Sequence, residues 1–405
     1  MTLAKTFSAL LFLSLACDFA CGAPETTMRP AAEIAAEMGT GWNLGNSMEV
    51  PGGEERWGNP PAAREMFEAV KAAGFGSVRI PCAWRSFADG EGNIDPARMA
   101  RVKEVVDDAL SCGLYVVLNI HTDGGWLEKN CTPRARAGVE KMQAKLWGQI
   151  SETFREYGDR LLFASANEPS AKDAEAAGVL RGYHQVFVDT VRASGGNNAE
   201  RCLVVQGPET DAEKTLLFDF LPRDPCKNRL MAEFHYYGPY WFGLCPQDGE
   251  EPWAKVRYFW GRGFEHPDIG GISRFDSGCD EEFVDGIFAR LKEKFCDRGI
   301  PLILGEYGAT RRSLADAALQ KKHDASRAYY YYYITRAAKL SGAVPFSWDN
   351  GVLESEGETF ALFDRRAGMK VCDEPCVRAI RDAARDASLM LLGAGPSNEG
   401  KYRWH

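Results

Sequence analysis

The stretch LLFASANEP, residues 161–169, has the pattern of a buried strand that ends in a polar pair. Its apolar residues, and the small residues after them, suit a strand that is covered on both faces. The run ends in Asn167 and Glu168, and Pro169 fixes the turn that follows. A carboxylate at the mouth of an apolar strand costs free energy unless the protein uses it. Glu168 is therefore a candidate functional residue.

Seven more apolar runs recur along the chain, at residues 40–46, 77–81, 115–121, 202–207, 230–237, 301–308 and 344–351. Helical patterns lie between them, for example at 62–73, 99–112, 140–157, 182–194 and 283–298. Eight alternating strand and helix units in about 350 residues predict an α/β protein with a (β/α)₈ TIM barrel as its single domain. The alternative is a doubly wound open sheet. That fold usually carries a Gly-rich phosphate turn after its first strand, and GWNLGN (41–46) lacks that pattern.

The N-terminus has the layout of a secretory signal peptide. Lys5 precedes an apolar run at 7–16, small residues follow at 20–23, and the run is too short to span a membrane. We expect a signal peptide at 1–22, a lead-in at 23–35, the barrel at 36–390 and a C-terminal tail at 391–405. The protein is then secreted, either free outside the cell or into the periplasm or onto the cell surface.

Cysteine content agrees with export. Of twelve cysteines, removal of Cys17 and Cys21 with the signal peptide leaves ten. An even number in an oxidising compartment predicts disulfides, and Cys372 and Cys376 lie close enough in sequence to close a small loop. A metal site is the other interpretation of cysteines. We expect no metal, because the sequence has no tight Cys/His cluster with zinc-ligand spacing.

The charge of the chain restricts its partners. The formal net charge is −9, with 26% charged and 45% hydrophobic residues. An excess of negative charge argues against nucleic acid or an anionic membrane as a partner. We expect a soluble monomer with a solvated surface.

Polar side chains gather where the predicted strands end: Arg79, His121, Asn167, Glu168, His235, Tyr237, Glu306, Trp348 and Asn350. The carboxyl ends of barrel strands converge on one face, where the active sites of such barrels lie. Two glutamates with two histidines at these positions are hard to explain as packing, since buried ionisable groups cluster at active sites.

Two facing carboxyl groups suit glycoside hydrolysis. One must be protonated to give the leaving oxygen a proton, and the other must be ionised to attack the anomeric carbon. Arg79 and Tyr237 are expected to hold one carboxylate charged, Asn167 to bind a sugar hydroxyl, and Trp348 to offer a flat apolar face to a sugar ring. Metal binding and catalysis by a nucleophilic serine are two other uses of such residues, and the sequence supports them less. The residues lack a metal-ligand spacing, and no G-x-S-x-G elbow marks a nucleophilic serine.

Seven motifs carry a family resemblance: GWNLGN (41–46), RIP (79–81), NIH (119–121), NEP (167–169), HYY (235–237), GEYG (305–308) and WDNG (348–351). Together they resemble glycoside hydrolase family 5, the cellulase-type members of clan A. The resemblance implies a retaining hydrolase that needs no cofactor, with Glu168 as acid/base and Glu306 as nucleophile. It also implies a sugar site lined by Arg79, His121, Asn167, His235, Tyr237 and Trp348, with Asn43 and Asn350 as further candidates.

The chain departs from the family pattern at two positions. Thr122 stands where many relatives have a second histidine, and Ala164 stands where many have a glutamate. These departures leave the preferred glycan open. We expect a secreted endo-β-1,4-glucanase acting on β-glucan. Alternatives are a mannanase, a xyloglucanase or a lichenase, and a catalytically silent glycan-binding barrel. For the free enzyme we expect Glu306 ionised and Glu168 protonated.

Three further features have an interpretation. The long segment 238–280 is rich in aromatic residues, which predicts either a minor core or a sugar platform. The five tyrosines at 329–333 and the histidines His184 and His323 lie in helical patterns. We expect packing roles for the tyrosines, and surface or packing roles for the two histidines.

Overall fold

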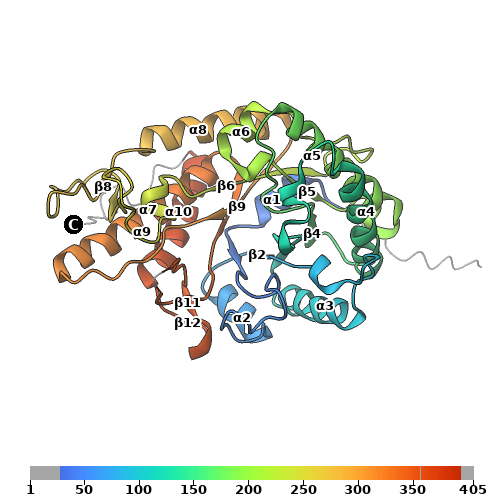
Figure 1. The fold of residues 1–405 in the computed structure, drawn as a ribbon, viewed down its shortest axis with the longest axis horizontal. Coiled ribbons are helices and arrows are strands. Elements are labelled where there is room, and N and C mark those ends of the chain that lie inside the picture. Colours follow the sequence, from blue (N-terminus) through green and yellow to red (C-terminus); the bar gives the residue numbers. More distant parts are fainter. Residues whose placement is uncertain (1–27, 356, 394–405) are drawn as a thin grey trace, which may run out of the picture.

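The computed structural model describes residues 28–355 and 357–393, and at its centre eight parallel strands form a closed barrel (Figure 1). The strands are β1 (Gly41–Asn43), β2 (Ser77–Ile80), β3 (Tyr115–Asn119), β4 (Leu161–Ala164), β5 (Leu203–Gln206), β6 (Leu230–Tyr236), β9 (Leu302–Tyr307) and β10 (Ala343–Ser347). The barrel closes where β1 pairs with both β2 and β10. The predicted (β/α)₈ fold is confirmed. Every strand lies within its predicted run, except that β10 begins one residue earlier.

Helices surround the barrel (Figure 1). They include α2 (Arg64–Ala72), α3 (Pro96–Ser111), α4 (Arg136–Thr153), α5 (Ala174–Ala193), α6 (Ala212–Leu217), α8 (Glu281–Lys294), α9 (Ala317–Leu340) and α10 (Glu374–Leu391). No helix in the described ranges is both long enough and apolar enough to cross a membrane. The expected signal peptide lies outside the described residues.

The core has two parts. One fills the inside of the barrel with fully buried side chains such as Val117, Val204 and Phe346, and the other lies between strands and helices. The inner core also includes Ile34 of α1 (Ala31–Glu37), so α1 packs on the interior of the barrel. Burial of each such side chain contributes roughly 1.5–3 kcal/mol. This packing puts residues 31–35, expected to belong to a lead-in, in contact with the barrel.

The segment 238–280 contains the minor core that the sequence gave as one of two alternatives, while its role as a sugar platform stays a prediction. Its later part carries the short strands β7 (Phe259–Trp260) and β8 (Phe275–Asp276), and Trp260 packs on Tyr330 of α9 with ring centroids 5.2 Å apart. Its earlier part carries α7 (Tyr240–Gly243), where Tyr240 is exposed, as is Trp253 in the following loop. The segment is therefore partly a minor core and partly an exposed aromatic surface. Tyr330 and Tyr331 are fully buried, which confirms the packing role expected of the tyrosine run.

The expected disulfides are not found. All ten cysteines from Cys82 to Cys376 are free thiols in the described part of the chain. Cys372 and Cys376 illustrate the reason, because they lie in different surroundings. The Cys372 thiol donates to the Ala361 carbonyl oxygen at 3.4 Å, whereas Cys376 is buried in the first turn of α10, where its backbone N–H donates to Asp373 Oδ1 at 3.3 Å.

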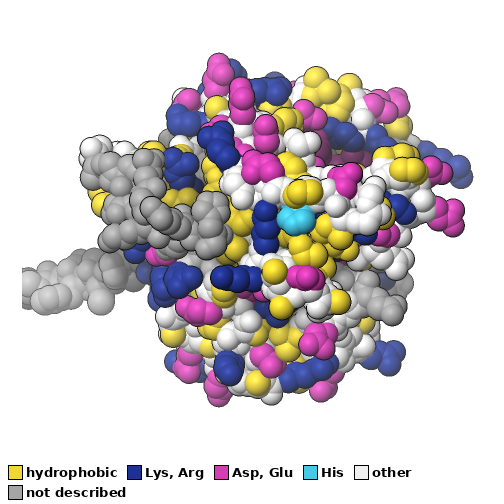
Figure 2. Space-filling model, turned by 90° about the vertical axis from the view of Figure 1, so that its left-hand side faces the viewer, with side chains coloured by type: hydrophobic (Ala, Val, Ile, Leu, Met, Phe, Trp, Pro, Cys, Tyr) yellow, Lys and Arg dark blue, Asp and Glu magenta, His cyan; other side chains and the backbone are white. Residues whose placement is uncertain are grey.

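One face of the molecule carries charges of both signs. Figure 2 shows acidic and basic side chains interspersed on the face that carries β8 and α9 in Figure 1. This mixing avoids a strong field of one sign on this face.

Candidate active site

Glu306 lies at the carboxyl end of β9, almost wholly buried, with 7% of its side chain exposed. Its Oε1 accepts a hydrogen bond from Arg79 Nη1 at 2.9 Å, and its Oε2 accepts one from the Tyr237 hydroxyl at 3.0 Å. Donors on both oxygens favour the charged carboxylate.

Glu168 lies four residues beyond the end of β4, and 46% of its side chain is exposed. Its backbone N–H donates to Glu128 Oε1 at 3.0 Å, which fixes the turn, and its own Oε1 contacts His235 Nδ1 at 2.8 Å. One carboxylate oxygen of Glu168, one of Glu306 and a ring nitrogen of His235 all lie within 4.8 Å of one another. The structure therefore places two carboxyl groups face to face, one enclosed and one open to solvent.

Arg79 is a fully buried hub beneath these carboxylates. Its Nη2 donates to Asn167 Oδ1 at 2.8 Å, and its Nη1 donates to Asn43 Oδ1 at 3.0 Å as well as to Glu306. Asn43 is fully buried too, and its Nδ2 donates to the Gly305 carbonyl at 2.9 Å. The sequence predicted sugar contacts for Arg79 and Asn43. In the structure both hold other site residues in place, because neither has exposed surface.

Trp348 and His121 form one wall of the site. Their rings are stacked, with centroids 5.9 Å apart and planes within 6° of parallel. A side chain on Gly45 would meet the indole ring at 2.8 Å, so glycine is needed at that position. Burial, and then the charge of Arg79, keep the pKa of His121 well below 6.5. His121 is therefore neutral and can both donate and accept a hydrogen bond.

Asn350 differs from the sequence prediction. Its Oδ1 accepts from the backbone N–H groups of Val352 and Phe360, each at 3.1 Å, and its Nδ2 donates to the Glu358 carbonyl at 3.2 Å. With 4% exposure and these partners inside the protein, Asn350 shapes the loop after β10 rather than facing a sugar. Phe360 in that loop packs on Tyr237, with ring centroids 5.9 Å apart.

Sequence reasoning missed three buried polar residues near the site. Glu233 of β6 forms an ion pair with Arg79 Nε at 3.1 Å and contacts His235 Nε2 at 3.2 Å. Gln206 of β5 donates to Glu233 at 2.6 Å, and Glu128 holds the backbone of Glu168. A signal for Glu233 was present, because a charged residue interrupts an apolar strand two positions before His235.

The electrostatics of the free site reverse one expectation. Three carboxylates surround His235, and although its burial alone lowers its pKa, they raise it to about 10. Partial burial raises the pKa of Glu168, but the contact with His235 outweighs this and holds it below 4.5, whereas burial raises the pKa of Glu306. The sequence led us to expect a protonated Glu168. The difference has a physical cause, because His235 carries the proton next to it and the carboxyl groups titrate as a coupled set.

Glu168, His235 and Glu306 also have a spacing that a metal ion could use. The guanidinium of Arg79, 2.9 Å from Glu306, is a permanent cation that makes this position unfavourable for a second one. These residues are thus better suited to proton transfer than to metal binding.

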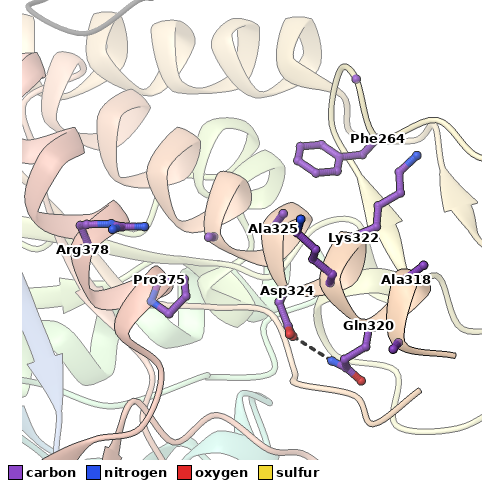
Figure 3. A pocket seen from close by; sticks show the side chains of 12 residues that line it. Phe264, Ala318, Gln320, Lys322, Asp324, Ala325, Pro375 and Arg378 are labelled. Atoms are coloured by element: carbon purple, nitrogen blue, oxygen red, sulfur yellow. Dashed lines mark hydrogen bonds between the residues drawn. The ribbon is translucent and has the colours of Figure 1, made fainter. Parts of the chain in front are cut away.

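A separate hollow of about 760 Å³ lies on the outside of the barrel (Figure 3). It is lined by the first turns of α9 and α10 and by Phe264, and Gln320 donates to Asp324 across part of its wall at 2.9 Å. None of the predicted site residues lines this hollow, so it is distinct from the site at the carboxyl ends of the strands.

Comparison with known proteins points to one family. The sequence model described as Cellulase (glycosyl hydrolase family 5) matches residues 42–353. The chain is 36% identical over 367 residues to the xyloglucan-specific endo-beta-1,4-glucanase of Bacteroides ovatus, an alignment covering 85% of this chain and 69% of that protein. It is 34% identical to Endoglucanase A of Paenibacillus barcinonensis, covering 88% and 92%.

Solved structures agree with the sequence comparisons. A xyloglucan-specific beta-1,4-glucanase from a ruminal metagenomic library, in complex with XXLG, superposes with a TM-score of 0.80 at 35% identity and covers 88% of this chain and 96% of that one. A broad specificity endoglucanase from Clostridium cellulovorans superposes with a TM-score of 0.75 at 30% identity and covers 89% and 98%.

Proposed function

Because the chain belongs to glycosyl hydrolase family 5 and is therefore a glycoside hydrolase, we propose that it is a retaining endo-β-1,4-glucanase, with Glu306 as nucleophile and Glu168 as acid/base. The observation that carries this proposal is the close approach of the two carboxyl groups, whose nearest oxygens lie within 4.8 Å. Retaining enzymes hold this pair roughly 5–5.5 Å apart, whereas inverting enzymes leave roughly 6.5–9.5 Å for a water molecule.

The surroundings of the two carboxylates support different roles. Glu306 is enclosed, and although burial raises its pKa, the hydrogen bonds from Arg79 and Tyr237 favour the ionised form that a nucleophile needs. Glu168 is 46% exposed in its side chain, so water can reach it for the second step. In the first step Glu306 attacks the anomeric carbon while Glu168 protonates the leaving oxygen. In the second, Glu168 takes a proton from water, whose oxygen attacks the same carbon and releases Glu306.

The wall formed by Trp348 and His121 suits the sugar ring beside the bond that is cut. The indole offers an apolar face, and neutral His121 offers a hydrogen-bonding edge. Asn167, whose Oδ1 accepts from Arg79 Nη2, is proposed to bind a hydroxyl of the same ring. The substrate is then a β-1,4-glucan chain lying across the carboxyl ends of the strands.

Xyloglucan is the second candidate substrate, because two of the similar proteins are xyloglucan-specific. Reducing-sugar release from carboxymethylcellulose, xyloglucan, lichenan and mannan compares the candidates in one assay. We expect activity on at least one of the three glucans, with endo-cleavage visible as a rapid fall in viscosity. Absence of release from all three, under conditions where a related endoglucanase is active, would contradict the proposal.

The stereochemistry has its own test. Proton NMR of the first product should show the β-anomer before mutarotation, and early α-anomer would contradict a retaining mechanism. We also propose that the protein is exported by its N-terminal segment and acts as a monomer. N-terminal sequencing of the exported protein should begin near residue 23.

A further inference from the structure

Glu233 is a buried carboxylate directly beneath the active site. It lies in β6 with no exposed surface, and its Oε2 accepts a hydrogen bond from Gln206 Nε2 at 2.6 Å. Its Oε1 pairs with Arg79 at 3.1 Å and with His235 Nε2 at 3.2 Å. A buried carboxylate with these partners is ionised, because opposite charge and hydrogen bonding both favour the charged form.

The fold makes room for this carboxylate next to the nucleophile. A Cβ atom on Gly305 would lie 2.1 Å from Glu233 Oε1, so the absence of a side chain there lets Glu233 approach the backbone just before Glu306. Such a close approach is a common reason for glycine within a strand.

His235 is held between two carboxylates by its two ring nitrogens. Nε2 faces Glu233 at 3.2 Å and Nδ1 faces Glu168 at 2.8 Å. Although burial alone would raise it, the contact with His235 holds the pKa of Glu168 below its ordinary value, so Glu168 is the acceptor at Nδ1 as Glu233 is at Nε2. With both carboxylates ionised, both nitrogens carry a proton and the ring is an imidazolium in the free site. Glu233, His235 and Glu168 thus form a row that ends at the open carboxyl group.

We propose that Glu233 is a positioning residue that fixes the acid proton of the reaction on His235 Nδ1, from which Glu168 receives it when the glycosidic bond breaks. The inference rests on the proposed function and adds a source for the proton that Glu168 delivers. Glu233 itself touches neither the sugar nor the reacting atoms.

The proton that His235 gives up in the first step is restored to it in the second. In the first, the Nδ1 proton moves to the Glu168 carboxylate and on to the leaving oxygen, while Glu306 forms a bond to the anomeric carbon. His235 is then neutral with its remaining proton on Nε2, facing Glu233. In the second, water gives its hydroxyl to the anomeric carbon and its proton to Glu168, which returns it to Nδ1 as Glu306 leaves.

Several charged or titratable groups surround His235 and its carboxylate partners, and each affects the charge of the site. They are Arg79 from β2, His121 after β3, Glu168 after β4, Glu233 in β6 itself, Tyr237 just after it and Glu306 from β9. His121 stays neutral, and burial raises the pKa of Tyr237 well above 10, so neither changes charge near neutral pH. Glu233 can be substituted while Glu168 and Glu306 are both kept, so its role can be tested separately from theirs.

The test is the pH profile of kcat/KM for Glu233→Gln. Removing this negative charge lowers the affinity of His235 for its Nδ1 proton. The basic limb of the profile should therefore move to lower pH by roughly 1–3 units. The shift should appear with a cello-oligosaccharide, whose leaving group needs a proton. It should vanish with a dinitrophenyl cellobioside, whose leaving group departs without one. A purely structural role would lower activity equally at all pH values and for both substrates.

Asp373→Asn is the matched control, because Asp373 is a buried carboxylate paired with Arg327 at 2.7 Å, between α9 and α10. It should leave the basic limb in place. An unshifted limb in Glu233→Gln would overturn the inference. The proposed function would still stand if Glu168→Ala and Glu306→Ala abolish hydrolysis, and it would fall if they do not.

A second measurement is made on the unmodified enzyme, and a variant serves only to assign the signal. Nitrogen-15 NMR of His235, identified by its loss in His235→Gln, should show both ring nitrogens protonated from pH 6 to pH 8. A ring that titrates near the ordinary histidine pKa of about 6.5 would contradict the inference.

Discussion

Replacing His323 by glutamine should make the protein less sensitive to acid. His323 is fully buried in α9, where its Nδ1 faces the Tyr258 carbonyl at 2.7 Å and its Nε2 accepts the Arg312 backbone N–H at 3.1 Å. These partners require the neutral ring with its proton on Nδ1. Protonation of Nε2 would set two N–H groups against each other, and burial together with the charge of Arg327 lowers the pKa of His323 to about 3.

The sign and size of the effect follow from this pKa. In the unfolded chain the ring binds a proton below about pH 6.5, while the folded protein cannot bind it until near pH 3. Acid therefore favours the unfolded state, and stability falls as pH drops through this window. At about 1.4 kcal/mol per unit, His323 accounts for about 2 kcal/mol of the stability lost between pH 7 and pH 5.

Urea unfolding at pH 7, 6 and 5 measures this loss. The free energy of unfolding of His323→Gln should fall by about 2 kcal/mol less than that of the wild type across this range. His184→Gln should behave alike, because burial lowers the pKa of His184 to about 4. Parallel pH dependences for the wild type and His323→Gln would refute the reasoning, even if the variant were less stable at every pH.

Two other predictions concern the sugar wall and the cysteines. Trp348→Ala removes the indole stacked on His121 and should lower kcat/KM by about tenfold or more, the equivalent of about 1.5–3 kcal/mol of apolar contact. Trp348→Phe should retain most of the activity. Equal activity of the wild type and both variants would contradict a sugar-facing role. Thiol titration of denatured, unreduced protein should find the ten cysteines from Cys82 to Cys376 free. If most of these cysteines reacted with the thiol reagent only after reduction, they would be paired in disulfides.

The barrel could be predicted from sequence because its strands are buried on both faces. Each is a short apolar run with a polar residue at its carboxyl end, and parallel strands bring those ends to one face. The same rule predicts from the sequence that Glu168, His235 and Glu306 lie close together. The separation of the two carboxyl groups was known only by family resemblance, and the structure supplies it.

What the sequence did not reveal was which site residues face the substrate. Arg79, Asn43 and Asn350 have the chemistry of sugar ligands, but their polar atoms are used within the protein. Whether a polar side chain binds the substrate or another protein group depends on which neighbour lies within hydrogen-bonding distance. Strand periodicity does not encode that. The charge state of Glu168 was misjudged for the same reason, because it depends on a contact with His235 at 2.8 Å.

The roles of Glu168 and Glu306 are tested most directly by the anomeric configuration of azide products. Glu168→Ala keeps the nucleophile, so an activated aryl β-glycoside should still form the glycosyl-enzyme, and azide should trap it as the β-glycosyl azide. Glu306→Ala opens space on the opposite face, so azide entering there should give the α-glycosyl azide. The account predicts this pair of products. The reverse pair would exchange the two roles, and hydrolysis reduced by less than about tenfold in both variants would show that these carboxylates are not the catalytic pair.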